Sequence, residues 1–378
     1  MIKYLIILLF IISFASCNQT EIEDSVNDIS LSKAMGDVEE ENFTKAIDKI
    51  EFVFPKDHGP HPDFRTEWWY FTGNLTDKSN RKFGYQFTIF RTALTKKKEI
   101  RNSDWSSNQI YMAHFAVTDI ENDEFYFEER FSREANKLAG AQIDPLNVWL
   151  EDWQVIQIGD NIKFDLPTIS ISAKTGQVQI DFTLTASKPK VLQGEDGLSQ
   201  KGKQPGNASY YYSYTRLNTE GKIILNEQEL EVLGYSWMDR EWSTSALSDD
   251  QVGWDWFAFQ FNDNSEIMYY QMRKKDGTPD KYSKGIIVDK KGSSKLIKNE
   301  EVNLEVTDYW ESPSGIRYPS GWKLDIPNES IKLEITPAIK KQLMDVSINY
   351  WEGAVLIEGL KNNEKLNGRG YVELTGYY

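Results

Sequence analysis

The 378-residue chain has a single cysteine, Cys17, and only three histidines. One cysteine excludes an intramolecular disulfide and the paired-cysteine zinc sites. His58 and His61 stand three positions apart in "DHGPHPDF", but no further histidine or cysteine lies near them in the sequence to complete a metal site. We therefore expect the chain to bind no metal.

The chain also has few basic residues: 43 Lys and Arg stand against 58 Asp and Glu, a net charge of −15. Nucleic acid is thereby excluded as a partner, because binding its phosphates requires a basic surface. The glycine-rich loops that bind nucleotide phosphates are missing, so we expect no cofactor. The stretch "GYSWM" around Ser236 holds only the first half of the serine-hydrolase elbow, which disfavours that class of enzyme.

The N-terminus carries the pattern of an export signal. Lys3 precedes an apolar run over residues 4–14 that is too short to span a bilayer, and the run ends in Ala-Ser-Cys17, as in a bacterial lipobox. We expect residues 1–16 to be a lipoprotein signal peptide, Cys17 to be lipidated, and acidic, polar residues 17–45 to form a disordered tether. A plain secretory signal is the alternative. The lipoprotein interpretation places the protein in a bacterial cell envelope, anchored to a membrane and facing the periplasm or the cell surface.

The remaining chain alternates apolar and polar residues with a period of two, as in "KFGYQFTIFRTAL" and "ISISAKTGQVQIDFTLTAS". Turn residues recur every 8 to 12 positions, which is typical of antiparallel sandwiches and barrels. Only residues 128–138 and 338–343 offer short helical patterns. We predict an all-β protein of two antiparallel β-barrel domains packed together, at residues 46–230 and 231–378, each large enough to hold a ligand.

Aromatic residues are abundant, at 13% of the chain with 12 Trp. Core and cross-strand packing explains many of them. Several Trp residues lie near acids, however, as in "TEWWYF" and "GWDWFAFQF", which also fits a pocket that combines aromatic rings with carboxyl groups.

The stretch "LGYSWMDREW", residues 233–242, combines two acids with two Trp residues. On a strand, Asp239 and Glu241 share one face with Trp237, whereas Arg240 lies on the other. We expect the Asp239 face to point inward, because an unpaired buried arginine is costly, although Glu67 or Asp255 could pair with Arg240. The alternative is that Asp239 holds strands together in a salt bridge.

Several motifs occur in a fixed order from about residue 52 to the C-terminus: "HGPHPDFRTEWWYFTGNL", "YMAHFAVTD", "SYYYSYTRL", "GYSWMDREW", "GWDWFAFQF", "YWEGAVLIEG" and "GRGYVELTGY". Together they resemble the lipocalin-like family of AttH-type proteins and carotenoid 1,2-hydratases, also called hydroxyneurosporene synthases. The resemblance implies two lipocalin-like barrels with a ligand site near their junction. The family includes hydratases of linear carotenoids and cyclases of polyketide-derived substrates.

In the hydratase branch, an aspartate that follows an aromatic residue acts as proton donor, which by resemblance is Asp239 with Trp237 before it. The branch's upstream His-x-Trp falls on Ser209 and Tyr211, so this chain departs from the pattern there. That departure puts hydration of a carotenoid in doubt.

Three functions remain open. The first is an enzyme that performs acid-catalysed hydration or lyase chemistry on a long apolar, isoprenoid-like substrate, with Asp239 as the acid and Glu241 or His114 tuning it. Its expected ligand-binding residues are Glu67, Trp68, Trp69, Tyr211, Trp237, Trp242, Trp254 and Trp256. The second is a non-catalytic lipid carrier that uses the same cavity, and the third is a surface interaction or attachment protein. The sequence leaves the oligomeric state open.

Overall fold

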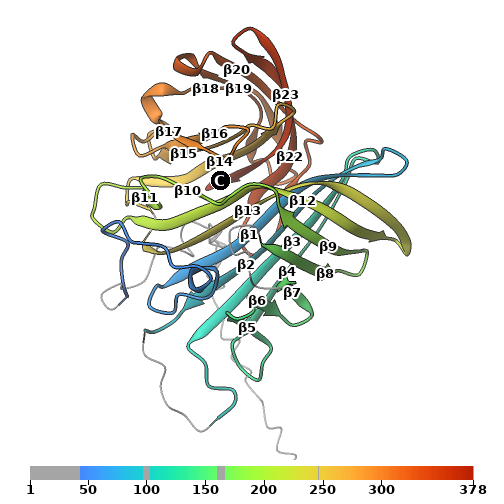
Figure 1. Ribbon diagram of the computed structural model, residues 1–378, viewed down its shortest axis with the longest axis vertical. Coiled ribbons are helices and arrows are strands. Elements are labelled where there is room, and N and C mark those ends of the chain that lie inside the picture. Colours follow the sequence, from blue (N-terminus) through green and yellow to red (C-terminus); the bar gives the residue numbers. More distant parts are fainter. Residues whose placement is uncertain (1–42, 97–102, 160–166, 246, 378) are drawn as a thin grey trace, which may run out of the picture.

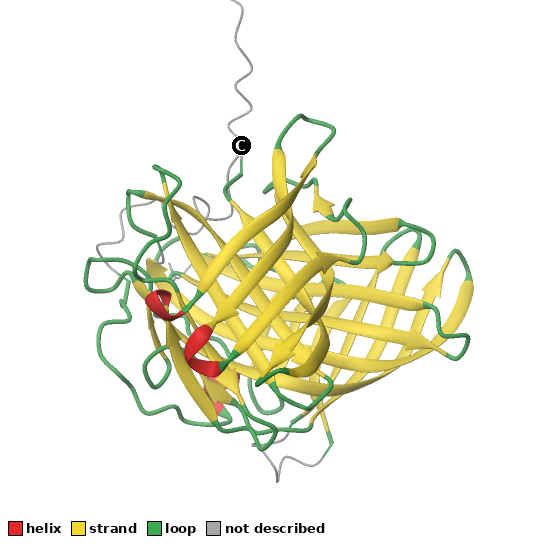
Figure 2. Cartoon of the chain, turned by 90° about the horizontal axis from the view of Figure 1, so that it is seen from above, coloured by secondary structure: helices red, strands yellow, loops and turns green. Residues whose placement is uncertain are grey.

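The computed structural model describes residues 43–96, 103–159, 167–245 and 247–377, and its regular structure is almost entirely strand (Figures 1 and 2). The helical exceptions are the 3-10 turns η1 (Lys56–His58), η2 (Asn299–Glu301) and η3 (Pro327–Glu329). The predicted all-β class is therefore confirmed. Cys17, the signal peptide and most of the expected tether lie outside the described residues.

The first sheet curls into a nearly closed barrel (Figure 1). Every neighbouring pair in it is antiparallel, and β6 packs against β2, β3 and β4, which brings the two ends of the sheet together. Its strands, in spatial order, are β4 (Glu124–Arg133), β3 (Gln109–Asp119), β2 (Lys82–Ala93), β1 (Thr66–Asp77), β13 (Gln228–Ser245), β12 (Ala208–Leu225), β9 (Val178–Ala186), β8 (Thr168–Lys174), β7 (Trp153–Ile158), β6 (Asn147–Leu150) and β5 (Ala139–Gln142), with β10 (Val191–Leu192) and β11 (Leu198–Gln200) paired to β12.

The second sheet forms a half-barrel and is also antiparallel. Its strands, in spatial order, are β17 (Ser294–Lys298), β16 (Lys284–Val288), β15 (Glu266–Lys274), β14 (Gln251–Phe261), β23 (Glu364–Thr375), β22 (Tyr350–Lys361), β20 (Ile331–Pro337), β19 (Arg317–Ile326) and β18 (Asn303–Glu311), with β21 (Leu343–Met344) paired to β22. Each curled sheet encloses an apolar core of its own.

The chain passes from the first sheet to the second between β13 and β14. The division predicted after residue 230 therefore falls inside β13, which pairs with β1 and β12 of the first sheet. Both short helices that the sequence patterns predicted, at the described residues 128–138 and 338–343, are absent from the structure. Most of the stretch 128–138 lies in β4 and its following turn, whereas residues 338–340 form bends and β21 begins at Leu343. Pairing with the neighbouring strand outweighed the weak local preference for helix.

Burial along the strands explains where a site can form. In β9 buried and more exposed positions alternate strictly, because one face lines the barrel core and the other meets solvent. In β1 and in the second half of β13, nearly every residue is buried. There the two sheets pack against each other, and a third apolar cluster, which includes Tyr70, Trp237 and Trp256, fills the space between them. Among the described residues, no helix is long and apolar enough to cross a membrane.

Candidate active site between the two sheets

A pocket opens between the two sheets. Aromatic rings dominate its lining, together with three carboxyl groups and one amine. The lining residues are Trp68, Tyr70, Phe90, Lys201, Tyr211, Asp239, Glu241, Trp254, Trp256, Tyr270, Met272 and Glu373. This composition, mostly apolar with a few converging polar groups, is typical of small-molecule sites.

Strand pairing in the first sheet builds one wall of the pocket. Asp239 on β13 lies between Tyr70 of β1 and Ser213 of β12. Two positions along the same strand, Glu241 lies between Trp68 of β1 and Tyr211 of β12. Because alternate residues of a strand share a face, these two rows of side chains project toward the second sheet together.

Strand pairing in the second sheet builds the facing wall. Glu373 on β23 lies between Glu352 of β22 and Trp256 of β14, and Trp256 in turn pairs with Tyr270 of β15. Contacts cross the gap between the walls: the ring centroids of Tyr70 and Trp256 are 5.2 Å apart in an edge-to-face arrangement. The two sheets therefore enclose the pocket jointly.

The Asp239 carboxyl is buried and is surrounded by neutral donors. Its Oδ2 accepts a hydrogen bond from the Tyr211 hydroxyl at 2.6 Å, and its Oδ1 accepts bonds from the Ser213 hydroxyl and, at 2.6 Å, from the Trp237 indole nitrogen. Burial raises the pKa of Asp239 to about 7, although all three donors oppose the rise. Desolvation outweighs hydrogen bonding here, so a substantial fraction of Asp239 is protonated near neutral pH.

Lys201 is the cation of the pocket. Its ammonium pairs with the Glu241 carboxylate and lies 5.6 to 5.8 Å from the ring centroids of Trp68, Tyr211 and Tyr270. Aromatic faces attract positive charge at such distances. The rings of this pocket are therefore arranged to stabilise a cation.

Glu373 and Glu352 form a pair of buried carboxyl groups on the facing wall. The Trp254 indole donates to Oε1 of Glu373 at 2.6 Å, and the Tyr70 hydroxyl donates to Oε1 of Glu352 at 2.7 Å. Burial raises the pKa of Glu373 to about 7. Burial and then the charge of Glu373 hold the pKa of Glu352 well above its ordinary value.

The structure brings together many of the residues expected from the sequence. Those that line the pocket are Trp68, Tyr211, Asp239, Glu241, Trp254 and Trp256, and Trp237 contacts Asp239 directly. Two expected ligand-binding residues lie elsewhere, since Trp69 and Trp242 are part of the apolar core inside the first barrel. Each neighbours a pocket residue in sequence and therefore points to the opposite face of its strand.

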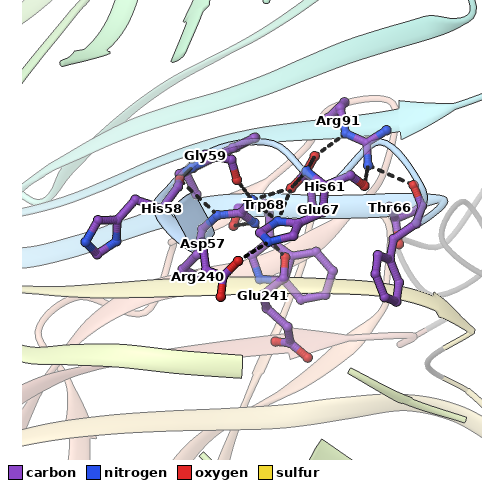
Figure 3. Close-up of polar contacts among 12 residues, drawn as sticks. Asp57, His58, Gly59, His61, Thr66, Glu67, Trp68, Arg91, Arg240 and Glu241 are labelled. Carbon is purple, nitrogen blue, oxygen red and sulfur yellow. Dashed lines mark hydrogen bonds and ion pairs between the residues drawn. The ribbon is translucent and has the colours of Figure 1, made fainter. Parts of the chain in front are cut away.

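Glu67 also lies on the barrel side of β1, within a buried ionic network (Figure 3). Its carboxylate is paired with both Arg91 and Arg240, and His61 donates its backbone N–H to it at 3.0 Å. Burial alone would raise the pKa of Glu67, but the two guanidinium groups outweigh burial and hold the pKa well below its ordinary value. In Figure 3 the Glu241 carboxyl points away from this network.

His114 on β3 lies behind the pocket rather than in its lining. The Nδ1 of His114 is 2.7 Å from the Tyr350 hydroxyl, and its Nε2 is 3.0 Å from the Glu129 carboxylate. Its ring packs on Phe90, a pocket residue, with ring centroids 5.5 Å apart. His114 therefore contacts the pocket lining through Phe90.

The acidic and basic site residues Glu352, Glu373 and Lys201 were not identified from the sequence, nor were the polar residues Tyr70, Ser213 and Tyr270. Glu352 and Glu373 occur in the motifs "YWEGAVLIEG" and "GRGYVELTGY", where each interrupts an apolar stretch, and that interruption was the available signal. Lys201 follows β11, in a long polar insertion without a pattern of its own. Within the described residues, no group of three or more His, Cys, Asp or Glu side chains is placed to hold a metal ion.

The family profile described as AttH-like matches residues 45–377. A crystal structure of an AttH protein from Nitrosomonas europaea is 30% identical, with a TM-score of 0.77, and the match covers 89% of this chain and 100% of that one. Kievitone hydratase from Nectria haematococca is 16% identical, with a TM-score of 0.65 over 89% of this chain and 96% of that one. CghA in complex with Sch210972 is 11% identical, with a TM-score of 0.53 and the same two coverages.

No curated protein matches the chain. The profile spans nearly all of the described residues, and the family resemblance seen in the sequence motifs is thereby confirmed. The chain belongs to the AttH-like family.

Proposed function

We propose that this protein is an enzyme that binds a long hydrophobic, unsaturated substrate between its two sheets and adds water to it by acid catalysis. The observation that carries the proposal is Asp239, a buried carboxyl in an aromatic pocket with a pKa raised to about 7. A carboxyl group can donate a proton near neutral pH only when its surroundings keep it partly neutral.

Protonating the carbon of an alkene leaves a carbocation, which must be stabilised until water reaches it. The rings of Trp68, Tyr211 and Tyr270 already surround the ammonium of Lys201, so the same rings suit a substrate cation. Asp239 supplies the proton, and the rings stabilise the charge that this creates.

A second hollow favours a long substrate. It shares Trp68 and Phe90 with the first pocket. Of its other lining residues, Ile110, Met112, Phe131 and Ile348 are apolar, whereas Thr66, Glu67, Arg91 and Thr92 are polar or charged. An extended chain that reacts beside Asp239 would therefore place its tail past Phe90 in this hollow.

One structural relative is named a hydratase. It is kievitone hydratase, and CghA was crystallised with Sch210972. Their low identity to this chain means that they support a shared fold, while the reaction class is inferred from the pocket itself.

We also propose that the protein is a lipoprotein of a bacterial cell envelope, anchored to a membrane through lipidated Cys17. The apolar run over residues 4–14 and the Ala-Ser-Cys sequence after it support this. An anchored barrel would meet hydrophobic substrates where they are concentrated, at the membrane surface.

A non-catalytic lipid carrier is the second candidate. Both oxygens of Asp239 already accept hydrogen bonds, two at Oδ1 and one at Oδ2. A carboxylate satisfied in this way could simply hold Tyr211 and Trp237 in place around a bound lipid. In that role Asp239 would order the pocket without transferring a proton.

The experiment compares the native protein with Asp239→Asn. Apolar compounds that copurify with each protein are identified by mass spectrometry, and the same compound is then incubated with both in isotopically labelled water. We expect the native protein to add one water and the variant to bind the compound but to react at least ~100-fold more slowly. Asp181→Asn, a change at an exposed strand aspartate, is the control. Equal turnover by both proteins would remove Asp239 from the chemistry, and release of the compound unchanged by both would favour the carrier.

A further inference from the structure

We infer that Glu373, with Glu352 beside it, is the general base of this pocket: it takes the proton from the water that adds to the substrate cation. This inference rests on the proposed function, because it assigns a second residue to the same reaction. It follows from three features: the pairing of the two carboxyl groups, their burial without an ion pair to any cation that the structure describes, and their position opposite Asp239.

The two carboxyl groups are direct neighbours across β22 and β23, where Glu352 pairs with Glu373. Glu352 is fully buried and Glu373 is 8% exposed, and of the two only Glu373 lines the pocket. Two carboxylates this close repel each other in a dry site, so near neutral pH the pair holds one proton and one negative charge.

The groups that face the pair are mostly neutral. Tyr70 donates to Glu352, and Trp254 donates to Glu373. Lys201, the nearby cation, is paired with Glu241 on the other wall. Its charge lowers the pKa of Glu373, and the charge of Glu241 raises it. A carboxylate pair that carries one proton can accept a second from water. Its raised pKa values make it a stronger base than an exposed glutamate.

Asp239 and Glu373 belong to different walls. Asp239 lies on β13 of the first sheet, whereas Glu373 lies on β23 of the second. A substrate between the sheets would have the acid on one side and the base on the other, so that the proton and the water reach opposite faces of the double bond. Glycosidases that activate a water use two carboxyl groups on opposite sides of the substrate in a comparable way.

The proposed step is balanced. The Asp239 proton bonds to one alkene carbon, and the electron pair of the double bond forms the new C–H bond, which leaves a cation on the other carbon. Water forms a C–O bond to that carbon and gives one proton to Glu373. The pair then returns a proton to the Asp239 carboxylate through solvent. The net change is alkene plus water to alcohol, without any other reactant.

The first test measures protonation and needs no substrate. In the Asp239→Asn background, infrared spectroscopy at pH 7 should still detect a protonated carboxyl from the pair. Adding Glu352→Gln should weaken that signal, because Glu352 has the higher pKa of the two and carries most of the shared proton. Glu358→Gln is the matched control, because Glu358 lies on the same strand and pairs with Glu334 across an exposed part of the second sheet. If Glu352→Gln and Glu358→Gln leave the same spectrum, the pair does not share a proton and the inference fails.

The second test uses N,N-dimethyldodecylamine, whose ammonium mimics a substrate cation, and dodecanol, which has no charge. We expect Glu373→Gln to weaken binding of the amine about tenfold while binding of dodecanol stays the same. Glu352→Gln should change amine binding little, since Glu373 alone then carries the single charge. Glu358→Gln should change neither.

The outcomes separate the two proposals. If dodecanol binds and Glu373→Gln leaves amine binding unchanged, the role of Glu373 is wrong while the hydrophobic site remains. If neither probe binds the native protein, the proposed function fails as well. Should Glu373→Gln not fold, amine binding to Asp239→Asn is followed from pH 5 to pH 8. A rise in affinity toward pH 8 supports the inference, and a constant affinity overturns it.

Discussion

Asp239 and Arg240 are consecutive residues of β13, and both are buried, but their side chains lie on opposite faces of the first sheet. Asp239 faces the pocket between the sheets, whereas Arg240 faces the barrel and pairs with Glu67. A strand that packs between two layers has no solvent face, so each side chain needs partners of its own. Asp239 has neutral donors around it, and Arg240 has a carboxylate.

This difference predicts how Asp239→Asn changes the pH dependence of stability. The pKa of Asp239 is about 7 in the folded protein and about 3.8 when exposed. Between those values the folded state keeps a proton that the unfolded state loses, so this carboxyl destabilises the native fold increasingly as pH rises. Asparagine removes the effect, while its Nδ2 can donate to the Tyr211 hydroxyl.

We expect the free energy of unfolding of Asp239→Asn, relative to the native protein, to increase by roughly 1.4 kcal/mol for each pH unit over this range and to level off above it. Urea unfolding from pH 4 to pH 8 measures the difference. A variant that loses stability equally at every pH would mean that Asp239 is ionised throughout, as in a structural salt bridge.

The partner of Arg240 gives a second prediction. Glu67 is fully buried between Arg91 and Arg240, so Glu67→Gln leaves two guanidinium groups without their carboxylate. We expect a loss of about 3–5 kcal/mol in the free energy of unfolding at pH 7, measured by urea denaturation.

The control for Glu67→Gln is Glu229→Gln, which breaks an exposed pair with Lys222 and should change stability little. Because the pKa of Glu67 is held well below 4.5, its contribution is present above that pH and is lost as the pH falls through the folded value. A Glu67→Gln protein as stable as the native one would show that the arginines find other partners.

Local alternation predicted the strands and placed Asp239, Glu241 and Trp237 on one face, because the period of two is a property of the strand itself. Alternation could not predict which of Trp68 and Trp69 lines the pocket. Adjacent residues must point to opposite faces, but which face meets the second sheet depends on how the sheets pack. Glu373 was not identified as a site residue from the sequence, because its neighbours in the pocket come from strands that are far away in the sequence.

The lipid anchor is tested by Cys17→Ala. If Cys17 carries acyl chains, the native protein should partition with the membrane fraction of bacterial cells. The variant should move to the soluble fraction, because it lacks the acyl chains that anchor the protein in the membrane. Immunoblots of separated fractions measure the shift. A Cys17→Ala protein that stays with the membrane would indicate a protein partner in place of the acyl chains.

The length of the substrate site is tested at Met112. This residue lines the second hollow and packs against Phe90 and Ile348, but it does not line the pocket that holds Asp239. Met112→Trp should fill part of the hollow and leave the pocket around Asp239 intact. If the tail of a long ligand occupies the hollow, displacing two methylene groups costs about 1.6 kcal/mol.

We therefore expect Met112→Trp to weaken binding of octadecanol by more than about tenfold and to leave binding of octanol unchanged, as measured by calorimetry. Met112→Leu, which keeps the volume and the apolar character of the side chain, should bind both alcohols like the native protein. An equal loss of affinity for both alcohols would mean that the tryptophan disturbs the whole site. Unchanged binding of octadecanol would mean that the ligand ends before Phe90, and the substrate would then have to be a short one.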